Sequence, residues 1–413
     1  MKYFPSKNPI LLGLIFLFWP IGAFLIAINT FYLKESKVII YLFMILFGFT
    51  FVFFNEDLDS FYYAEYFSSI ASISYDEFIK VYANFLSSEL TLDLAKPIIA
   101  FTFSRISDDP RVYYGVIAAI FGYFYLKSIS IAYAKYVKKK NSNTLFYLLI
   151  FVLILNPIFY INGFRFYTAV WIFFFGTYNF VLYRQKKYLW LCFLSCLFHF
   201  SFIVPSLVLL LYYIFGNKNK LYYIFFLLSF FIGDIILVLF SQISPFLAEG
   251  VSAKSSRYIN SDSIELFSSI NETKVIGVWY IVIAGKTLKY YIIYLFFYTR
   301  IKSKKVFKNF ETENLFSISL LLLSFANAVS FIPTFGRFML LFYLFAILYV
   351  ITVNQFASLK NMSFLIIIGL IPFLLNGILI LRLAIDITNP LLFTIMPSPF
   401  IFDQTSIYEC FFN

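Results

Sequence analysis

Residues 160–201 read YINGFRFYTAVWIFFFGTYNFVLYRQKKYLWLCFLSCLFHFS. One apolar run starts at Arg165 and ends at a basic turn, residues 184–187, and a second run then carries the only histidine of the chain, His199. An apolar run of about twenty residues crosses the hydrocarbon core of a bilayer as a helix. A charged group at the edge of such a run is costly and needs a reason. The stretch therefore predicts a membrane protein whose spans surround Arg165.

The composition of the whole chain points the same way. Of its 413 residues, 62% are hydrophobic and only 13% are charged, which is too little polar surface for a soluble domain. Similar apolar runs recur along the length, whereas a β-barrel would show short alternating strands. We expect one all-α polytopic transmembrane domain over residues 1–413. Counting the runs predicts ten to twelve transmembrane helices.

The net charge of +11 comes largely from lysines in short turns between the apolar runs. Such turns are typical of the cytoplasmic side of membrane proteins, so the charge indicates membrane orientation and no nucleic-acid partner. The basic turns are residues 34–37, 135–140, 184–187, 218–220 and 300–308. Placing all of them in the cytoplasm puts the other loops outside.

Three longer segments are then predicted to be extracytoplasmic. The first loop, residues 55–96, is acidic and carries Tyr and Phe at helical spacing, which favours helices that lie on the membrane surface. The second loop is residues 241–274, and the C-terminal tail is residues 382–413. After the first loop, Asp108-Asp109-Pro110 is predicted to cap the start of the next span.

All the basic turns can lie in the cytoplasm only if residues 188–215 enter and leave the membrane on the cytoplasmic side. That stretch is also long for one crossing at about 1.5 Å per residue, so we predict a helical hairpin. His199 or Pro205 would mark its break. On this topology His199 lies on the side of the basic turns and is a helix-break residue rather than a catalyst.

Several arginines fall at the predicted outer face. Arg165 and Arg337 each follow a glycine by one or two residues and begin an apolar span, which places a guanidinium where it needs an anion. Guanidinium binds phosphate through two parallel hydrogen bonds and keeps its charge. Arg257 and Tyr258 of the second loop would close over that anion. Arg111 and Arg382 also lie near this face, where they either join the site or reach toward lipid headgroups.

Carboxylates of the first loop are the candidate catalytic groups. Glu56, Asp57 and Asp59 directly follow a span, and Asp93 precedes a short apolar stretch. A carboxylate can remove a proton from a hydroxyl or orient sugar hydroxyls. For most acids of an outer loop, simple solvation is the alternative. The three adjacent carboxylates are only a weak metal pattern, and we expect neither a metal nor another cofactor.

These features together resemble a known family. Gly163-Phe164-Arg165, the basic turn at 184–187 and the run ending in Leu197-Phe198-His199-Phe200-Ser201 are similar to the EpsG-type polysaccharide polymerases, which include many O-antigen polymerases called Wzy. The acidic, tyrosine-rich residues 55–63 and the turn Phe335-Gly336-Arg337-Phe338 resemble that group as well. The likeness extends over most of the chain in layout.

The resemblance implies a multi-spanning glycosyltransferase of surface polysaccharide or lipopolysaccharide biosynthesis. It would join oligosaccharide repeat units carried on undecaprenyl pyrophosphate, at the periplasmic face of the bacterial inner membrane. The implied partners are these lipid-linked substrates, membrane lipids and a protein that regulates chain length. The arginines would bind the pyrophosphate, and a carboxylate would serve as base.

Two alternatives share much of this pattern. A lipid-linked oligosaccharide flippase would also be helical and basic, but it would place charges along a pathway in mid-span and needs only short loops. An O-antigen ligase would use nearly the same chemistry with a larger late outer loop. The two long outer loops favour the polymerase.

Overall fold

A computed structural model describes residues 8–53, 56, 58–83, 92–138, 143–243, 246, 249–250, 252, 279–303, 309–332, 334–356, 361–393 and 405–412. Within these ranges the protein is all-helical, and its one β-type contact is an isolated bridge between Phe51 and Thr388. Asp57, Arg257 and Tyr258 lie outside the described residues, as does most of the second predicted loop.

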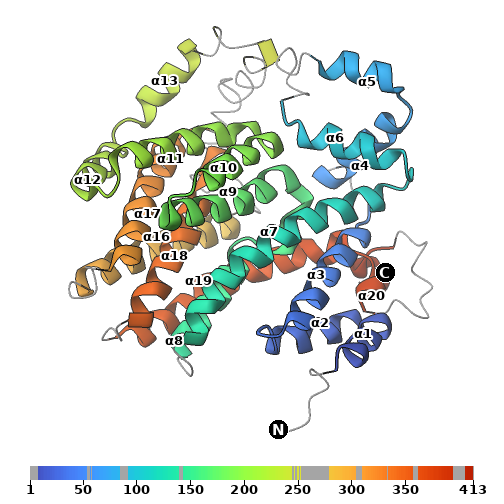
Figure 1. Ribbon diagram of the computed structural model, residues 1–413, viewed down its shortest axis with the longest axis horizontal. Helices are drawn as coiled ribbons and strands as arrows, with labels where there is room; N and C mark the ends of the chain where they lie inside the picture. Colours follow the sequence, from blue (N-terminus) through green and yellow to red (C-terminus); the bar gives the residue numbers. More distant parts are fainter. Residues whose placement is uncertain are drawn as a thin grey trace.

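The helices follow the apolar runs in chain order (Figure 1). They are α1 (Pro9–Phe18), α2 (Pro20–Asn29), α3 (Lys34–Phe49), α4 (Asp59–Ala71), α5 (Tyr75–Tyr82), α6 (Ala95–Ser104), α7 (Pro110–Lys138), α8 (Asn143–Leu155), η3 (Ile158–Gly163), α9 (Phe164–Tyr183), α10 (Lys186–Phe198), η4 (Phe200–Phe202), α11 (Ile203–Phe215), α12 (Asn219–Leu228), α13 (Gly233–Ile243), α16 (Trp279–Lys302), α17 (Phe310–Val329), η6 (Phe335–Phe338), α18 (Met339–Phe356), α19 (Met362–Ile387), η7 (Pro390–Leu392) and α20 (Ile407–Phe412).

The prediction of a polytopic α-helical membrane protein is confirmed, but the count of ten to twelve spans is not supported. Six helical segments of the described residues are long and apolar enough to cross a bilayer. They are Pro110–Val137, Asn143–Tyr183, Trp279–Lys302, Phe310–Val329, Phe335–Phe356 and Met362–Ile387. The difference has a physical cause, because several predicted spans are broken into shorter helices.

The first apolar run of the chain, residues 9–32, shows this clearly. Pro20 cannot continue a helix with full hydrogen bonding, so the chain breaks at Trp19 into α1 and α2, each of ten residues. Ten helical residues rise about 15 Å, roughly half the hydrocarbon thickness. The predicted C-terminal tail differs as well, because α19 remains helical through Arg382 and ends at Ile387.

Short polar caps begin several helices. Asp109 precedes Pro110 at the start of α7, and its Oδ1 accepts a hydrogen bond from the backbone N–H of Arg111 at 2.9 Å. This is the cap predicted from the sequence, with proline in the first turn where a missing N–H costs nothing. In the first loop, Ser74 and Glu77 form a reciprocal capping box that starts α5.

Residues 186–215 form two helices, α10 and α11, separated at His199 by the short turn η4. Helix α10 packs along α9, and α11 packs on α17 (Figure 1). Gly176 allows the close approach of α9 and α10, because a Cβ at this position would lie 2.7 Å from Cys192 Sγ. The hairpin therefore has a defined tip at residues 199–202.

Two ends of the helix bundle can be distinguished by their contacts. At one end, Phe51 after α3 stacks on Tyr114 of α7, and Tyr113 contacts Phe164 of α9 edge to face. The backbone N–H of Asn389, after α19, donates to Thr50 O at 2.7 Å. Helices α4 and α6 pack at this end as well. Because the first loop is rich in acids, we call it the acidic end.

The opposite end holds those residues of the basic turns that the structure describes. Lys135 of α7 pairs with Glu311 of α17, and Tyr178 of α9 donates to the same carboxylate at 3.1 Å. Nearby turns add Arg184 over the ring of Tyr212. We call this the basic end. The acidic loop and the basic turns therefore lie at opposite ends of the bundle, as the charge pattern of the sequence predicted.

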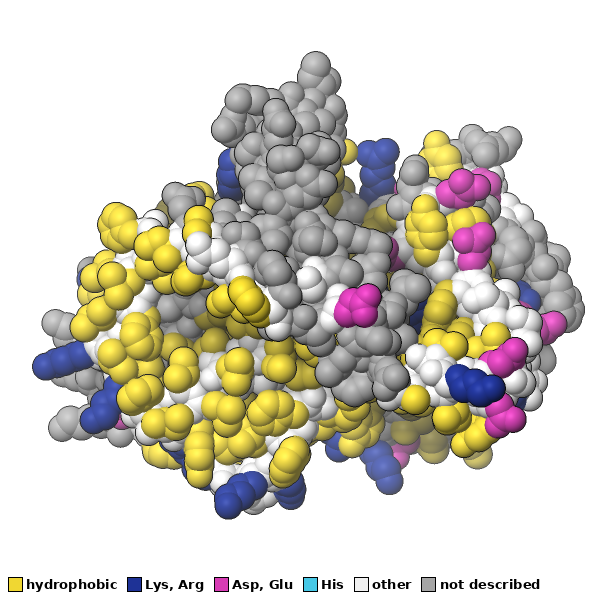
Figure 2. All heavy atoms as spheres, turned by 90° about the horizontal axis from the view of Figure 1, so that it is seen from above, with side chains coloured by type: hydrophobic (Ala, Val, Ile, Leu, Met, Phe, Trp, Pro, Cys, Tyr) yellow, Lys and Arg dark blue, Asp and Glu magenta, His cyan; other side chains and the backbone are white. Residues whose placement is uncertain are grey.

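Figure 2 shows the molecule from above the view of Figure 1. Hydrophobic side chains cover its left half, where Figure 1 places α11, α12 and α13. Most of the acidic side chains visible in this view lie on the right, where Figure 1 places α4 to α6. An apolar outer surface of this extent suits contact with lipid rather than water.

Candidate functional site at the acidic end

Arg165 lies in the first turn of α9 and makes two charge-assisted contacts. Its Nε donates to the Tyr63 hydroxyl at 2.7 Å, and its Nη1 donates to Asp93 Oδ2 at 2.6 Å. Tyr63 comes from α4, and Asp93 lies two residues before α6. Three segments that are far apart in sequence therefore converge on one guanidinium.

A local contact explains why α4 meets α9 at this point. Asn162, the residue before the glycine that starts α9, accepts a hydrogen bond from the backbone N–H of Ser60 at 2.9 Å. That N–H belongs to the first turn of α4, where backbone donors lack partners within the helix. The Asn162 side chain therefore joins the starts of the two helices, and Tyr63 follows one turn later.

Asp93 is almost completely buried, with 3% of its surface exposed. While Oδ2 contacts Arg165, its Oδ1 accepts from the backbone N–H of Phe200 at 2.7 Å. Phe200 belongs to the tip of the hairpin. A buried carboxylate needs such partners to remain charged. Asp93 thus links the first loop, α9 and the hairpin.

Arg337 of η6 also lies beside the first turn of α9. Its Nη2 is 3.1 Å from His199 Nε2, and its Cζ lies 4.4 Å from the centre of the Phe166 ring. Phe166 is the neighbour of Arg165 in sequence. The turn η6 and the start of α9 therefore place both predicted phosphate-binding arginines at one end of the bundle, around the hairpin tip.

This arrangement corrects the predicted position of His199. We expected it on the side of the basic turns, because the hairpin enters and leaves there. Helix α10 does begin at the basic end, but its thirteen residues rise about 20 Å, which carries the tip to the level of Arg165 and Arg337. His199 is a direct neighbour of a predicted site residue and more than a helix break.

The predicted catalytic carboxylates separate by environment. Asp59, the first residue of α4, is exposed, whereas Asp93 is engaged by Arg165 and Phe200. Asp59 lies close to the start of α9, because its Oδ2 would be 3.5 Å from a Cβ placed on Gly163. Glu56 is exposed, and Asp57 lies outside the described residues.

Tyr63 contributes a neutral hydroxyl to the site. Burial raises its pKa to about 12, although the positive charge of Arg165 opposes the shift. The hydroxyl is therefore protonated throughout the physiological range. It accepts from Arg165 and keeps its own proton as a donor.

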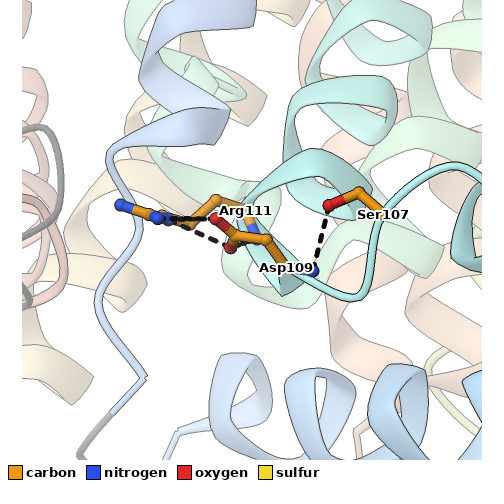
Figure 3. A network of polar contacts seen from close by, with 3 residues as sticks. All are labelled: Ser107, Asp109 and Arg111. Carbon is orange, nitrogen blue, oxygen red and sulfur yellow. Dashed lines mark hydrogen bonds and ion pairs between the residues drawn. The ribbon is translucent and has the colours of Figure 1, made fainter.

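Arg111 is not part of this cluster. Its guanidinium pairs with Asp109 in the turn that starts α7, with Nε–Oδ2 at 2.8 Å and Nη2–Oδ2 at 2.5 Å (Figure 3). Burial raises the pKa of Asp109, but the hydrogen bonds from Arg111 outweigh it and hold that pKa below its usual range. Arg382 is exposed on α19. The structure shows a contact of Arg111 that neither sequence alternative included, a local ion pair with Asp109.

Sequence reasoning missed Tyr63 and the backbone of Phe200 as partners in this cluster. The helical spacing of aromatics in the first loop indicated that α4 has a packed face, but it could not show which ring meets Arg165. Over the described residues, no group of three or more His, Cys, Asp or Glu side chains is placed to hold a metal ion.

The helices and the charged cluster define a polytopic α-helical membrane protein with a polar site at one end of an apolar bundle. A family model matches residues 38–391, most of the chain. The chain belongs to the EpsG family and is a polysaccharide polymerase-like membrane protein. No curated protein and no solved structure matches it.

Proposed function

We propose that the protein joins oligosaccharide repeat units carried on undecaprenyl pyrophosphate, with the acidic end facing the periplasm of a bacterial inner membrane. The observation that carries this proposal is the convergence of Arg165 and Arg337 around one hairpin tip. Two fixed guanidinium groups suit a pyrophosphate, which presents several oxygens at the membrane face. Family membership supports the polymerase class.

The proposed reaction is a glycosyl transfer. The hydroxyl of one lipid-linked unit attacks the anomeric carbon of the growing chain, and the bond from that carbon to the pyrophosphate oxygen breaks. The hydroxyl proton passes to a carboxylate, and the lipid pyrophosphate leaves with its electron pair. Negative charge grows on the leaving group, so fixed cations lower the barrier.

The two aspartates suit different parts of this reaction. Asp93 is buried and already accepts from Arg165 and Phe200, which suits a residue that positions the guanidinium. Asp59 is exposed beside Gly163, where an acceptor hydroxyl can reach it. We assign Asp59 the role of general base. Arg257, Tyr258, Glu56 and Asp57 remain proposed members of the site.

The test uses three arginines of the acidic end. Cells that lack the native protein would express Arg165→Ala, Arg337→Ala or Arg111→Ala, and their surface polysaccharide would be resolved as a ladder on a gel. We expect single repeat units only from the first two variants and a normal ladder from Arg111→Ala, whose partner is Asp109. Immunoblots would show that all three proteins accumulate equally.

Two outcomes would contradict the proposal. A normal ladder from both Arg165→Ala and Arg337→Ala would remove the role of the two arginines. Complete absence of repeat units in cells without the protein would favour a flippase, since a cell without a polymerase still displays single units. The same gel reads both outcomes.

A further inference from the structure

The only histidine of the chain lies at the tip of the hairpin and is almost entirely buried, with 4% of its surface exposed. Its two ring nitrogens have described partners: Nε2 lies 3.1 Å from Arg337 Nη2, and Nδ1 lies 2.6 Å from Ser201 Oγ. The ring also meets Phe166 edge to face, with centroids 5.5 Å apart. The imidazole is thus held on three sides.

Elementary hydrogen-bond chemistry assigns the protons of this ring. An arginine guanidinium has donors and no acceptor, so Nε2 must accept from Arg337 and carries no proton. A neutral imidazole then carries its single proton on Nδ1, which donates to the Ser201 oxygen. The Ser201 hydroxyl retains its own proton as a further donor.

We propose that His199 is a positioning residue that holds Arg337 through an unprotonated Nε2, in the neutral Nδ1–H form set by Ser201. This inference rests on the proposed role of Arg337 in pyrophosphate binding. The contact fixes one Nη of the guanidinium, while the Phe166 ring lies against its face. Arg337 is therefore oriented before the substrate arrives, which reduces the cost of ordering it on binding.

The groups that hold Arg165 and Arg337 differ in charge, and this difference explains why a histidine suits Arg337. Arg165 is held by a carboxylate, which offsets part of its charge. The imidazole and the Phe166 ring carry no negative charge, so these two contacts orient Arg337 and subtract nothing from its positive charge. A neutral acceptor is thus the suitable partner for a cation that must meet a negatively charged leaving group.

Two substitutions separate this role from simple packing. His199→Phe keeps an aromatic ring against Phe166 but removes the acceptor, and we expect polymer formation to fall about ten- to a hundredfold, the range for losing a hydrogen bond to a charged group. His199→Gln loses the ring but keeps a carbonyl oxygen that can accept from Arg337. We expect this variant to stay within about threefold of the wild type. Comparable activity of the two variants, or higher activity of His199→Phe, would overturn the proposal.

The single histidine also permits a direct measurement. Protein with ¹⁵N-labelled histidine and a non-histidine tag, in lipid bilayers, gives one pair of ring nitrogen resonances for solid-state NMR. At neutral pH we expect a protonated Nδ1 and an unprotonated Nε2, and we expect Arg337→Ala to shift the Nε2 resonance. A protonated Nε2 in the wild type would overturn the proposal. This readout does not depend on polymer synthesis. Normal ladders from both Arg165→Ala and Arg337→Ala would contradict the proposed function, whereas the resonances of His199 test the contact with Arg337 by themselves.

Discussion

The acidic and basic ends each hold an ion pair between distant segments, and the two pairs have opposite exposure. At the basic end the cation is buried: the side chain of Lys135 is 7% exposed and that of Glu311 is 24% exposed. At the acidic end the anion is buried: the side chain of Asp93 is 4% exposed and that of Arg165 is 32% exposed. Each pair also has a tyrosine partner, Tyr178 or Tyr63.

The difference separates a structural pair from a binding site. A buried lysine with an accessible carboxylate has its charge satisfied within the bundle and offers little to a ligand. A buried carboxylate with an accessible guanidinium can serve a ligand, because the carboxylate fixes the guanidinium and leaves part of that group facing outward. An ion pair alone is therefore poor support for a binding function. The exposed fraction of the cation distinguishes the binding pair from the structural pair.

Asp93→Asn should have the largest effect on activity. The amide can still accept from Phe200, but Arg165 loses the charge that fixes it. Truncating a charge pair of this kind costs about 2–5 kcal/mol, so polymer formation should fall by about a hundredfold or more. The measurement is the amount of polymer relative to the immunoblot signal. Unchanged polymer would mean that Asp93 does not position Arg165.

Glu311→Gln is the matched carboxyl-to-amide change at the basic end. It leaves the buried charge of Lys135 without its carboxylate, which should reduce the free energy of unfolding by about 3 kcal/mol. Activity per folded molecule should not change. Thermal unfolding of the purified protein in detergent, beside a ladder normalised to folded protein, checks both statements. A loss of specific activity would contradict the assignment of this pair as structural.

Tyr63→Phe should have an intermediate effect. It removes the hydroxyl that accepts from Arg165 Nε but keeps the ring and its edge contact with Phe164. A hydrogen bond to a charged group is worth about 1.5–3 kcal/mol, so activity should fall by about ten- to a hundredfold. Because the pKa of Tyr63 is raised to about 12, its hydroxyl should add no alkaline limb to the activity profile below pH 10. Wild-type activity in Tyr63→Phe would show that Asp93 alone is sufficient.

Asp109→Asn should have the smallest effect. Its pair with Arg111 joins neighbouring residues in one turn, and half-exposed local pairs contribute about 0.2–1 kcal/mol. The folded-state pKa of Asp109 is lowered, so its contribution is present above its unfolded pKa of about 3.9 and is lost as pH falls through the lower folded value. The difference in free energy of unfolding between wild type and variant should be smaller at pH 3 than at pH 7. A large loss of polymer would place this pair in the site.

Much of the architecture could be predicted from the apolar runs and basic turns. Hydropathy shows that a segment is apolar, but it does not show whether the segment remains one helix. Pro20 illustrates this limit, because a kinked span and two short helices have the same composition. The count of ten to twelve spans was therefore not supported, although the class of protein was confirmed.

The site was predictable in part for a similar reason. Arg165, Arg337 and Asp93 were recognisable because charges at the edge of apolar runs need partners. His199 was misplaced because the sequence shows where a hairpin enters and leaves but not how far its tip reaches. Tyr63 could not be selected from the many tyrosines of the first loop, since only the join between Ser60 and Asn162 aligns it with Arg165.

The contact between the ends of α3 and α19 has a consequence for biosynthesis. Thr50 and Phe51 leave the ribosome early, and their partners Asn389 and Thr388 follow only after every helix of the site has been made. During translation the arginine-bearing segments are therefore made before the contact between residues 50–51 and 388–389 can form. A nascent chain stalled before residue 388 would therefore hold both arginine-bearing segments and their described partners without this contact.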